Sequence, residues 1–240
     1  MSFYSKIKRI KKEFACLIPN LIPIIRFNFH YLPFKQAIYL PVFIKNARLK
    51  VLKGQVSIEA KRIYPGMIRL GFPSSCMVTN KGFYWLNRGK VLFNGTFKVA
   101  NDSVIETCSD AELIIGNNVS INGGLRMTCA KKIFIGDDFL GSWNISIYDT
   151  DFHRMTCLKT HKIIDSCSSE IIIGNHCWIG FGATLLKGSK LGGYCILGAK
   201  SLLNKDFESE NYQIISGAPA KPVKHGYYLN LSECEPEWHY

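Results

Sequence analysis

Residues 173–202 divide into five consecutive units of six: Ile173-Gly-Asn-His-Cys-Trp, Ile179-Gly-Phe-Gly-Ala-Thr, Leu185-Leu-Lys-Gly-Ser-Lys, Leu191-Gly-Gly-Tyr-Cys-Ile and Leu197-Gly-Ala-Lys-Ser-Leu. Each unit begins with an aliphatic residue, Gly follows in four of the five, and a small residue takes the fifth place in all of them. A period of six fits neither the alternation of a strand nor the turn of a helix. The repeat predicts short strands and tight corners, stacked into triangular coils with the aliphatic side chains pointing inward.

The period continues upstream, less regularly, and is interrupted twice. It begins near Ala47, and residues 80–89 have the composition of a turn-rich excursion before the sixes return over residues 91–148. Residues 149–169 contain no sixes and open with Asp149-Thr-Asp-Phe-His-Arg. Because functional residues gather on loops held by rigid scaffolds, we expect the second excursion to carry them.

The charge of the chain is concentrated at one end. Of 240 residues, 47% are hydrophobic, which permits one domain with appendages. Up to Arg69 there are 14 basic and 2 acidic residues, and beyond it 16 of each, so the whole net charge of +12 lies before residue 70. This asymmetry indicates an anionic partner for residues 1–69. A nucleic acid is not expected, because the basic segment has no recognisable reader motif.

The first 46 residues predict a cap on the solenoid or a segment at a membrane surface. Basic residues 6–12 precede an apolar strip that Pro19, Asn20 and Pro23 interrupt. We expect a short amphipathic helix ending before Pro19 and an irregular apolar strip to about Ile44. No apolar run approaches the ~18 residues of a spanning helix, and no cleavage site of a signal peptide follows. Contact with an anionic bilayer and capping of the first coil both remain open.

The nine cysteines form no CxxC pair and have no metal-ligand spacing. Cys177 and Cys195 occupy the small-residue place of the repeat. We therefore expect packed thiols rather than disulfides, as in a reducing compartment.

A set of motif residues makes the chain resemble a known family. They are Ile147, Asp149, Asp151 and His153, then Ile171, Ile173, Gly174, Trp178, Ile179 and Gly180, and the closing Gly-Ala-Pro-Ala-Lys-Pro-Val-Lys of residues 217–224. The pattern resembles the hexapeptide-repeat acyltransferases. It is similar to their branch of galactoside, maltose and nodulation-factor acetyltransferases and to capsular-polysaccharide O-acetyltransferases. The resemblance implies an all-β solenoid, a left-handed parallel β-helix over residues 47–224 followed by a tail at 225–240. It also implies a homotrimer with active sites between neighbouring subunits.

His153 is the candidate catalytic residue. A hydroxyl that attacks a thioester must lose its proton, and a neutral imidazole is the side chain best matched to accept it at neutral pH. Asp149 or Asp151 would orient the ring or bind acceptor hydroxyls, although a backbone carbonyl could orient it equally well. No Ser or Cys lies in a nucleophile motif, which favours direct transfer in a ternary complex. A corner N–H, that of Gly180, would meet the oxyanion.

The other candidates come from the resemblance. Asn122 and Asn144 are acceptor-site candidates or structural corner residues, and Trp178 flanks the cleft. Ala199 would offer backbone to the pantetheine arm of acetyl-CoA. The phosphates and phosphoadenosine would lie near Asn204 and Lys205 and near Lys221 and Lys224, as flexible cations suit a multiply charged anion. Phe181 and Lys200 depart from the smaller residues common at their positions.

The leading hypothesis is a cytoplasmic O-acetyltransferase that uses acetyl-CoA, needs no metal and modifies a sugar or polysaccharide precursor. N-acetyl transfer to an amino sugar remains open. A metal-dependent lyase like the γ-type carbonic anhydrases would need three convergent histidines, for which His153, His161 and His176 are present at other spacings. A non-catalytic scaffold, bound to an anionic surface through residues 1–69, is the remaining alternative.

Overall fold

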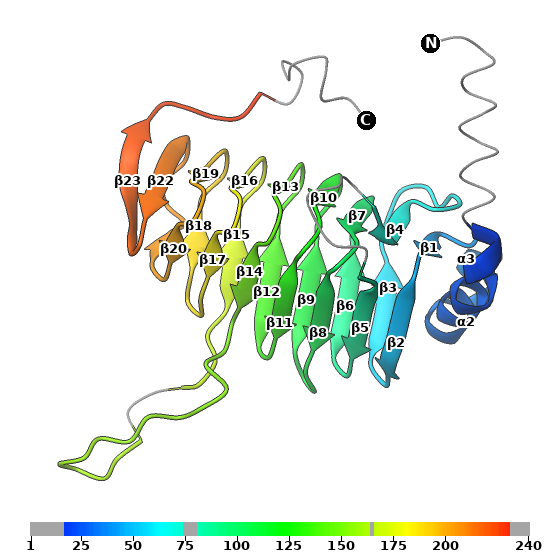
Figure 1. Ribbon diagram of the computed structural model, residues 1–240, viewed down its shortest axis with the longest axis horizontal. Helices are drawn as coiled ribbons and strands as arrows, with labels where there is room; N and C mark the ends of the chain where they lie inside the picture. The colour runs from blue at the N-terminus through cyan, green and yellow to red at the C-terminus, as the bar shows by residue number, and fades with distance from the viewer. Residues whose placement is uncertain (1–16, 74–80, 164–165, 231–240) are drawn as a thin grey trace.

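The computed structural model describes residues 17–73, 81–163 and 166–230, and its main body is a three-sided prism of stacked coils (Figure 1). Each coil gives one strand to each of three sheets, because strand neighbours within a sheet differ by three in sequence order. All neighbours pair in parallel except the last two strands, β22 and β23. This is a parallel β-helix, which confirms the solenoid predicted from the sixes.

The three sheets are numbered in the order in which the chain visits them. The first contains β1 (Val42–Ile44), β4 (Ile68–Phe72), β7 (Phe97–Ala100), β10 (Val119–Ile121), β13 (Leu140–Gly141), β16 (Trp178–Ile179), β19 (Ile196–Leu197), β22 (Gln213–Gly217) and β23 (Ala220–His225). The second contains β2 (Ala47–Leu52), β5 (Phe83–Asn87), β8 (Val104–Thr107), β11 (Arg126–Cys129), β14 (Ser146–Tyr148), β17 (Thr184–Leu185) and β20 (Leu202–Leu203). The third contains β3 (Gln55–Ile58), β6 (Lys90–Phe93), β9 (Glu112–Ile115), β12 (Lys132–Ile135), β15 (Ile171–Ile173), β18 (Lys190–Leu191) and β21 (Asp206–Phe207).

The strand register explains the period of six. Ile173 pairs with Leu191 and Ile179 with Leu197, so three units of six complete one coil. These aliphatic side chains point inward and are fully buried, and each contributes roughly 1.5–3 kcal/mol to stability. The small-residue place is buried as well, and its members are Cys177, Ala183, Ser189, Cys195 and Ser201.

Buried cysteines fill these places as free thiols. Burial raises the pKa of the Cys177 thiol to about 12, and it also raises the pKa of Cys195. The Cys177 Sγ donates to the Gly192 carbonyl across 3.1 Å. Within the described ranges the six cysteines are all unpaired, as predicted.

The corners rely on residues in the left-handed region of the backbone. At the first corner, between the first and second sheets, they are Asp102, Gly124, Asn144, Gly182 and Lys200. The N–H of Asn144 donates to Gly123 O (2.9 Å) and that of Gly182 to Trp143 O (2.9 Å), so each corner is bonded to the coil before it. A Cβ at Gly124 would lie 2.1 Å from Asn144 Oδ1, which is why this corner requires glycine.

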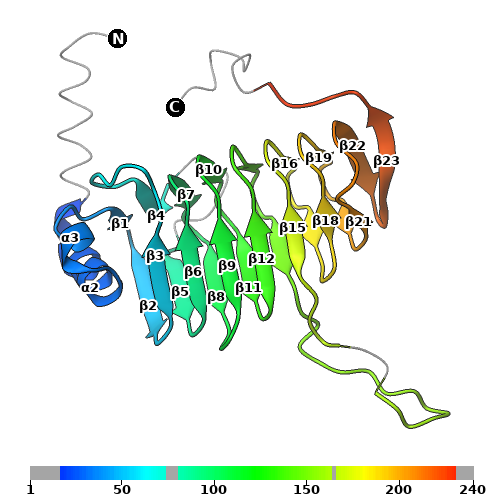
Figure 2. The same cartoon turned by 180° about the vertical axis from the view of Figure 1, so that it is seen from behind.

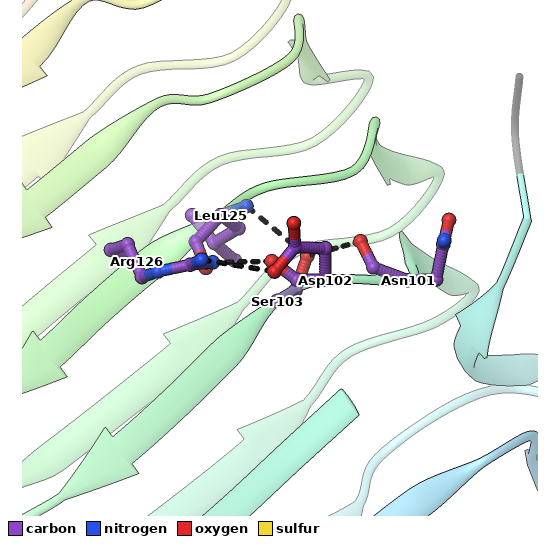
Figure 3. Close-up of polar contacts among 5 residues, drawn as sticks. All are labelled: Asn101, Asp102, Ser103, Leu125 and Arg126. Carbon is purple, nitrogen blue, oxygen red and sulfur yellow. Dashed lines mark hydrogen bonds and ion pairs between the residues drawn. The ribbon is translucent and has the colours of Figure 1, made fainter. Parts of the chain in front are cut away.

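Side chains reinforce the first corner in the early coils (Figure 3). Arg126 reaches back one coil, donating to the carbonyl of Asp102 and, across 3.0 Å, to its carboxylate. The Ser103 hydroxyl accepts from the N–H of Leu125 (3.1 Å) and donates to the carbonyl of Asn101 (3.3 Å). These contacts hold the less regular coils in line where the sixes are degenerate.

Two local predictions are wrong. Residues 20–44 were expected to be irregular, yet after a short 3-10 turn η1 (Ile18–Asn20) they form the helices α2 (Leu21–Tyr31) and α3 (Phe34–Ala37), and β1 follows. Pro23 is tolerated because it lies in the first turn of α2, where the N–H has no partner within the helix. The helix expected before Pro19 falls mainly on residues 1–16, outside the described part.

The first predicted excursion is also partly a strand. Phe83 and Trp85 point inward and are fully buried in β5, with the intervening Tyr84 half-buried. This alternation of two, not the period of six, places residues 83–87 in the second sheet. Residues 74–80 belong to the part of the chain not described.

Candidate active site

An arm leaves the prism between β14 and β15, at the second corner, between the second and third sheets (Figures 1 and 2). It contains the predicted excursion, residues 149–169, and Glu170 then leads into β15. Two antiparallel bridges hold its sides together, Thr150 with Ser168 near the prism and Thr156 with Ile163 farther out. The period of six therefore breaks because the chain makes a long hairpin outside the stack.

His153 lies between these two bridges and its side chain is exposed. Just before it, the N–H of Asp151 donates to Cys167 O across 2.8 Å. The N–H of Phe152, which has a left-handed backbone, donates to Thr150 Oγ1 across 3.0 Å. The backbone that carries the imidazole is thus fixed at the root of the arm, while the ring remains accessible.

Lys187 clamps the root of the arm to the prism. It lies between β17 and β18, and its Nζ is 2.9 Å from Asp151 Oδ2 and donates to Ser166 O across 2.9 Å. The two acceptors lie on opposite sides of the hairpin. Sequence reasoning missed this residue, although a signal was present. Lys187 belongs to the one unit in which Gly does not follow the aliphatic residue.

Asp149 and Asp151 have different surroundings. The side chain of Asp149 is fully buried, and its carboxylate accepts N–H groups from Ala130 (2.6 Å), Lys131 (2.8 Å) and Lys132 (2.8 Å). Both of its oxygens are therefore used in the turn between β11 and β12, and they are not available to orient His153 or to bind an acceptor. Asp151 is partly exposed beside His153 and is the carboxylate of the pair that a ligand can reach.

The first corner gathers a second group of predicted residues. Asn122, Asn144, Gly180 and Ala199 follow strands of the first sheet in successive coils. Trp178, on β16, is half-buried and its Nε1 donates to Ser142 Oγ across 3.0 Å. Asn144 is exposed, but its Oδ1 lies against the Gly124 corner, as a structural corner residue would.

The backbone N–H of Gly180 is not free for an oxyanion, because it donates to Leu197 O across 2.8 Å. The residue after Gly180 differs in this respect, and so does the equivalent residue one coil later. Within the described residues, the N–H groups of Phe181 and Ala199 donate to no acceptor. The available donor therefore lies one residue after the predicted one. Nearby, Lys200 Nζ lies 4.9 Å above the Phe181 ring, a cation–π contact.

The residues expected near the CoA phosphates are exposed but dispersed. Asn204 and Lys205 lie at the second corner, between β20 and β21. Lys221 and Lys224 lie on β23, which pairs antiparallel with β22 at the end of the first sheet. Lys224 Nζ lies 5.3 Å from the centroid of the Tyr227 ring.

The predicted residues therefore form two groups, one at each edge of the second sheet. His153, Asp151, Asn204 and Lys205 belong to the second corner, and Asn122, Asn144, Gly180 and Ala199 to the first. Corresponding points of the two corners are six residues apart, up to about 20 Å of extended chain. Within one subunit, the imidazole and the free corner N–H groups therefore belong to opposite edges of the second sheet.

A polar and aromatic column occupies the third corner, between the third and first sheets. The rings of His176, Tyr194 and Tyr212 are stacked with centroids 4.4 and 4.7 Å apart, and Tyr228 stands edge-on to both tyrosines. Asp138 accepts from Asn118 Nδ2 (2.7 Å) and lies 3.6 Å from His176 Nε2. His176, one of the three histidines that a metal site would need, thus lies in a packed column at a different corner from His153. In residues 17–73, 81–163 and 166–230, no three His, Cys, Asp or Glu side chains are grouped as metal ligands.

The chain is similar to known acetyltransferases in sequence and in structure. No protein-family model matches the chain. WbbJ of Escherichia coli K12, named as an O-acetyl transferase of lipopolysaccharide biosynthesis, is 23% identical over 160 residues, 64% of this chain and 81% of WbbJ. A chloramphenicol acetyltransferase of Klebsiella aerogenes is 43% identical over 113 residues, which are 47% of this chain and 51% of that relative. The chain thus spans about half the length of the second relative.

Among solved structures, the polySia-specific acetyltransferase NeuO matches with a TM-score of 0.51 at 19% identity, over 81% of this chain and 85% of NeuO. This likeness confirms the left-handed β-helix. The sequence relatives are named acetyltransferases, which confirms the resemblance drawn from the motif residues: the chain is related to these enzymes, and its class is that of an acyltransferase. In the part of the chain that is described, no helix is long and apolar enough to cross a membrane.

Proposed function

We propose that the chain is a CoA-dependent O-acetyltransferase that moves an acetyl group from acetyl-CoA to a hydroxyl of a sugar or polysaccharide precursor. The observation that carries this proposal is the position of His153. Its imidazole is exposed at the root of an arm that Lys187 and two bridges hold in place. A rigidly held, accessible imidazole is suited to general-base catalysis. Because acetyl-CoA is a cytoplasmic metabolite, we expect the reaction to take place in the cytoplasm.

In the proposed mechanism, His153 accepts the proton of the acceptor hydroxyl while the oxygen attacks the thioester carbonyl. The free N–H of Phe181 donates to the oxyanion of the tetrahedral intermediate, in the role first expected of Gly180. Collapse of the intermediate breaks the C–S bond, and the imidazolium returns its proton to the departing CoA thiolate. No acyl-enzyme is formed. Asp151, kept in place by Lys187, lies where it can bind acceptor hydroxyls beside His153.

The residues of the first corner fit the pantetheine part of acetyl-CoA. Ala199 is exposed and carries no bulky side chain, and its free N–H can donate to an amide carbonyl of the pantetheine arm. The exposed cations Lys205, Lys221 and Lys224 suit the phosphates. Phe181 makes this corner narrower than a small residue would. We therefore expect the pantetheine arm to pass on the Ala199 side.

We further propose a homotrimer in which the arm of one subunit meets the first corner of its neighbour. Two observations support this arrangement. The candidate residues are divided between the two edges of the second sheet, so a neighbouring copy is needed to join them. The arm also exposes four large apolar side chains that a neighbour would cover, those of Phe152, Met155, Leu158 and Ile163.

The acceptor class rests on the relatives and on the site. WbbJ is named for lipopolysaccharide biosynthesis, and a polyhydroxyl acceptor suits the partly exposed carboxylate of Asp151 beside the base. Chloramphenicol, named for the Klebsiella relative, is a second acceptor to test. N-acetyl transfer to an amino sugar would use the same base. The mass and alkali lability of the product separate an ester from an amide.

A consumption assay with acetyl-CoA tests the proposal across sugars, nucleotide sugars, lipid-linked oligosaccharides and chloramphenicol. With an acceptor that is turned over, His153→Ala should lower kcat roughly 10²–10⁴-fold and leave the oligomer intact. His161→Ala is the matched control, because His161 is an exposed histidine on the same arm, and its activity should be unchanged. Full activity of His153→Ala would remove the imidazole from the mechanism.

A further inference from the structure

Helix α2 has two apolar faces, of which one is buried and the other is exposed. Its buried face presents Ile24 and Phe27 to the first coils, and the Phe27 ring packs edge-on against Trp85 with centroids 5.3 Å apart. A neighbouring face carries Leu21, Ile25 and Phe29, one helical turn apart, and all three are exposed. Ile22 beside them is 81% exposed. Solvent-facing positions of a helix are ordinarily polar, and among the described residues nothing covers this apolar face.

The orientation of this face is fixed by hydrogen bonds. Asn28, fully buried on the inner side of α2, donates through Nδ2 to Val42 O (2.8 Å) and accepts the N–H of Val42 (3.1 Å). The Asn28 side chain thus joins α2 to β1, the first strand of the prism. Since Asn28 cannot leave its site without breaking both bonds, α2 cannot turn its outer apolar face inward.

The exposed apolar face continues onto the next helix. The ring of Phe34, at the start of α3, lies 6.1 Å from that of Phe29, and its side chain is 71% exposed. Ile38 and Tyr39 follow, each about half exposed. We call this surface the cap face, and its members are Leu21, Ile22, Ile25, Phe29, Phe34 and Ile38. It lies at the N-terminal end of the prism, the end opposite β22 and β23 (Figure 1).

The surroundings of the cap face are basic. Arg26 and Lys35 are exposed on the same two helices. Residues 17–69 contain nine Lys or Arg and a single acidic residue, Glu59. An apolar strip bordered by cations, with almost no carboxylates, is the composition of a surface that lies in the headgroup region of an anionic membrane.

We propose that the cap face binds an anionic lipid bilayer, with its aliphatic and aromatic side chains in the acyl boundary and the neighbouring cations at the headgroups. The charge selects this occupant over a second copy of the chain. Two cap faces brought together would oppose their positive charges, whereas an anionic bilayer neutralises them. Contact through short helices lying on the surface agrees with the absence, in the described ranges, of a helix that could span a membrane. The proposal is independent of the enzymatic one.

Co-sedimentation of the full chain with vesicles tests the proposal. Vesicles of phosphatidylcholine with phosphatidylglycerol should bind the protein, and vesicles of phosphatidylcholine alone should bind it at least tenfold more weakly. Ile22→Glu should lower binding at least tenfold. The matched control is Val223→Glu, a 62% exposed valine on β23 at the other end of the prism, which should bind as the unmodified chain does. Arg26→Gln and Lys35→Gln should each weaken binding about fivefold, the equivalent of about 1 kcal/mol per cation.

Two further measurements decide between a bilayer and other occupants of the cap face. With Ile22→Trp, brominated phosphatidylcholine in the anionic vesicles should quench the added tryptophan fluorescence, because the side chain enters the acyl region. Binding without that quenching would show that the cap face stays outside the acyl region, and would overturn the proposal. A smaller oligomer for Ile22→Glu in light scattering would assign the face to self-association instead.

Discussion

Asp149 shows how a residue in a catalytic-looking motif can have a purely architectural role. Its buried carboxylate accepts three backbone N–H groups from residues 130–132. These donors belong to the preceding turn at the second corner, at the base of the arm. Charged acceptors for backbone N–H groups are among the stronger hydrogen bonds in proteins. Asp149 therefore fixes the point from which the arm departs.

Asp149→Ala should destabilise the protein by about 3 kcal/mol or more, since three buried N–H groups lose their acceptor. Asp151→Ala, two residues away and partly exposed, should cost less than about 1 kcal/mol. Urea unfolding followed by circular dichroism measures both. Similar stabilities for the two variants would show that the Asp149 contacts contribute little.

The sequence alone could not show that Asp149 and Asp151 have different roles. The pattern Asp149-x-Asp-x-His names both as neighbours of the imidazole, and nothing within five residues identifies the N–H donors. They come from a segment 17–19 residues earlier, which only the strand register places beside Asp149. The prediction that the Gly180 N–H meets the oxyanion was wrong for a related reason. Which corner N–H is free depends on the pairing of β16 with β19, not on the identity of Gly180.

At the scale of the element, one lysine connects the two sides of the arm to the prism. Lys187 contacts both sides of the hairpin, through Asp151 and Ser166, and its side chain is only 18% exposed. An ion pair in such a partly buried setting holds its geometry better than one in free solvent. The arm root is therefore the rigid part of the excursion, and it is the part that carries His153.

Lys187→Ala should loosen the arm root without unfolding the prism. The expected loss of local stability is up to about 1 kcal/mol, or roughly fivefold faster amide exchange over the arm root. Hydrogen-exchange mass spectrometry of the arm peptides measures it. Lys159→Ala, at the exposed tip of the arm, is the control and should leave the exchange of the root unchanged. Equal exchange in both variants would rule out the clamp.

The strength of the period decided which elements could be predicted. From residue 171 to residue 203 the sixes give every strand, because aliphatic and small residues occupy fixed places in each coil. In the first two coils, the packing of large side chains determines the strands, and the period of six does not. Phe83 and Trp85 fill the interior with large rings on a strand pattern, and Phe27 of α2 closes the end of the core against Trp85. Helix α2 itself was obscured by Pro23, whose place in the first turn is visible only once the helix start is known.

At the scale of the whole molecule, the prism separates the two halves of the proposed site. The base is at the second corner and the free N–H groups of Phe181 and Ala199 are at the first, with the second sheet between them. In the proposed cyclic assembly, the second corner of one copy would meet the first corner of the next. The sequence predicted both groups of residues, but their separation follows from the topology of the coils. The proposed activity therefore requires a site shared between subunits.

Mixing two inactive variants tests this claim most directly. His153→Ala lacks the base, and Ala199→Trp blocks the exposed first corner where the pantetheine arm is expected. Each alone should be inactive and should form the same oligomer as the unmodified chain. When the two are unfolded together, refolded in equal amounts and assayed for acetyl transfer, roughly a quarter of the sites of a cyclic oligomer should combine an intact His153 with an intact first corner. Activity near one quarter of the unmodified protein is the predicted result. Mixed oligomers with no more activity than the separate variants would contradict the shared site.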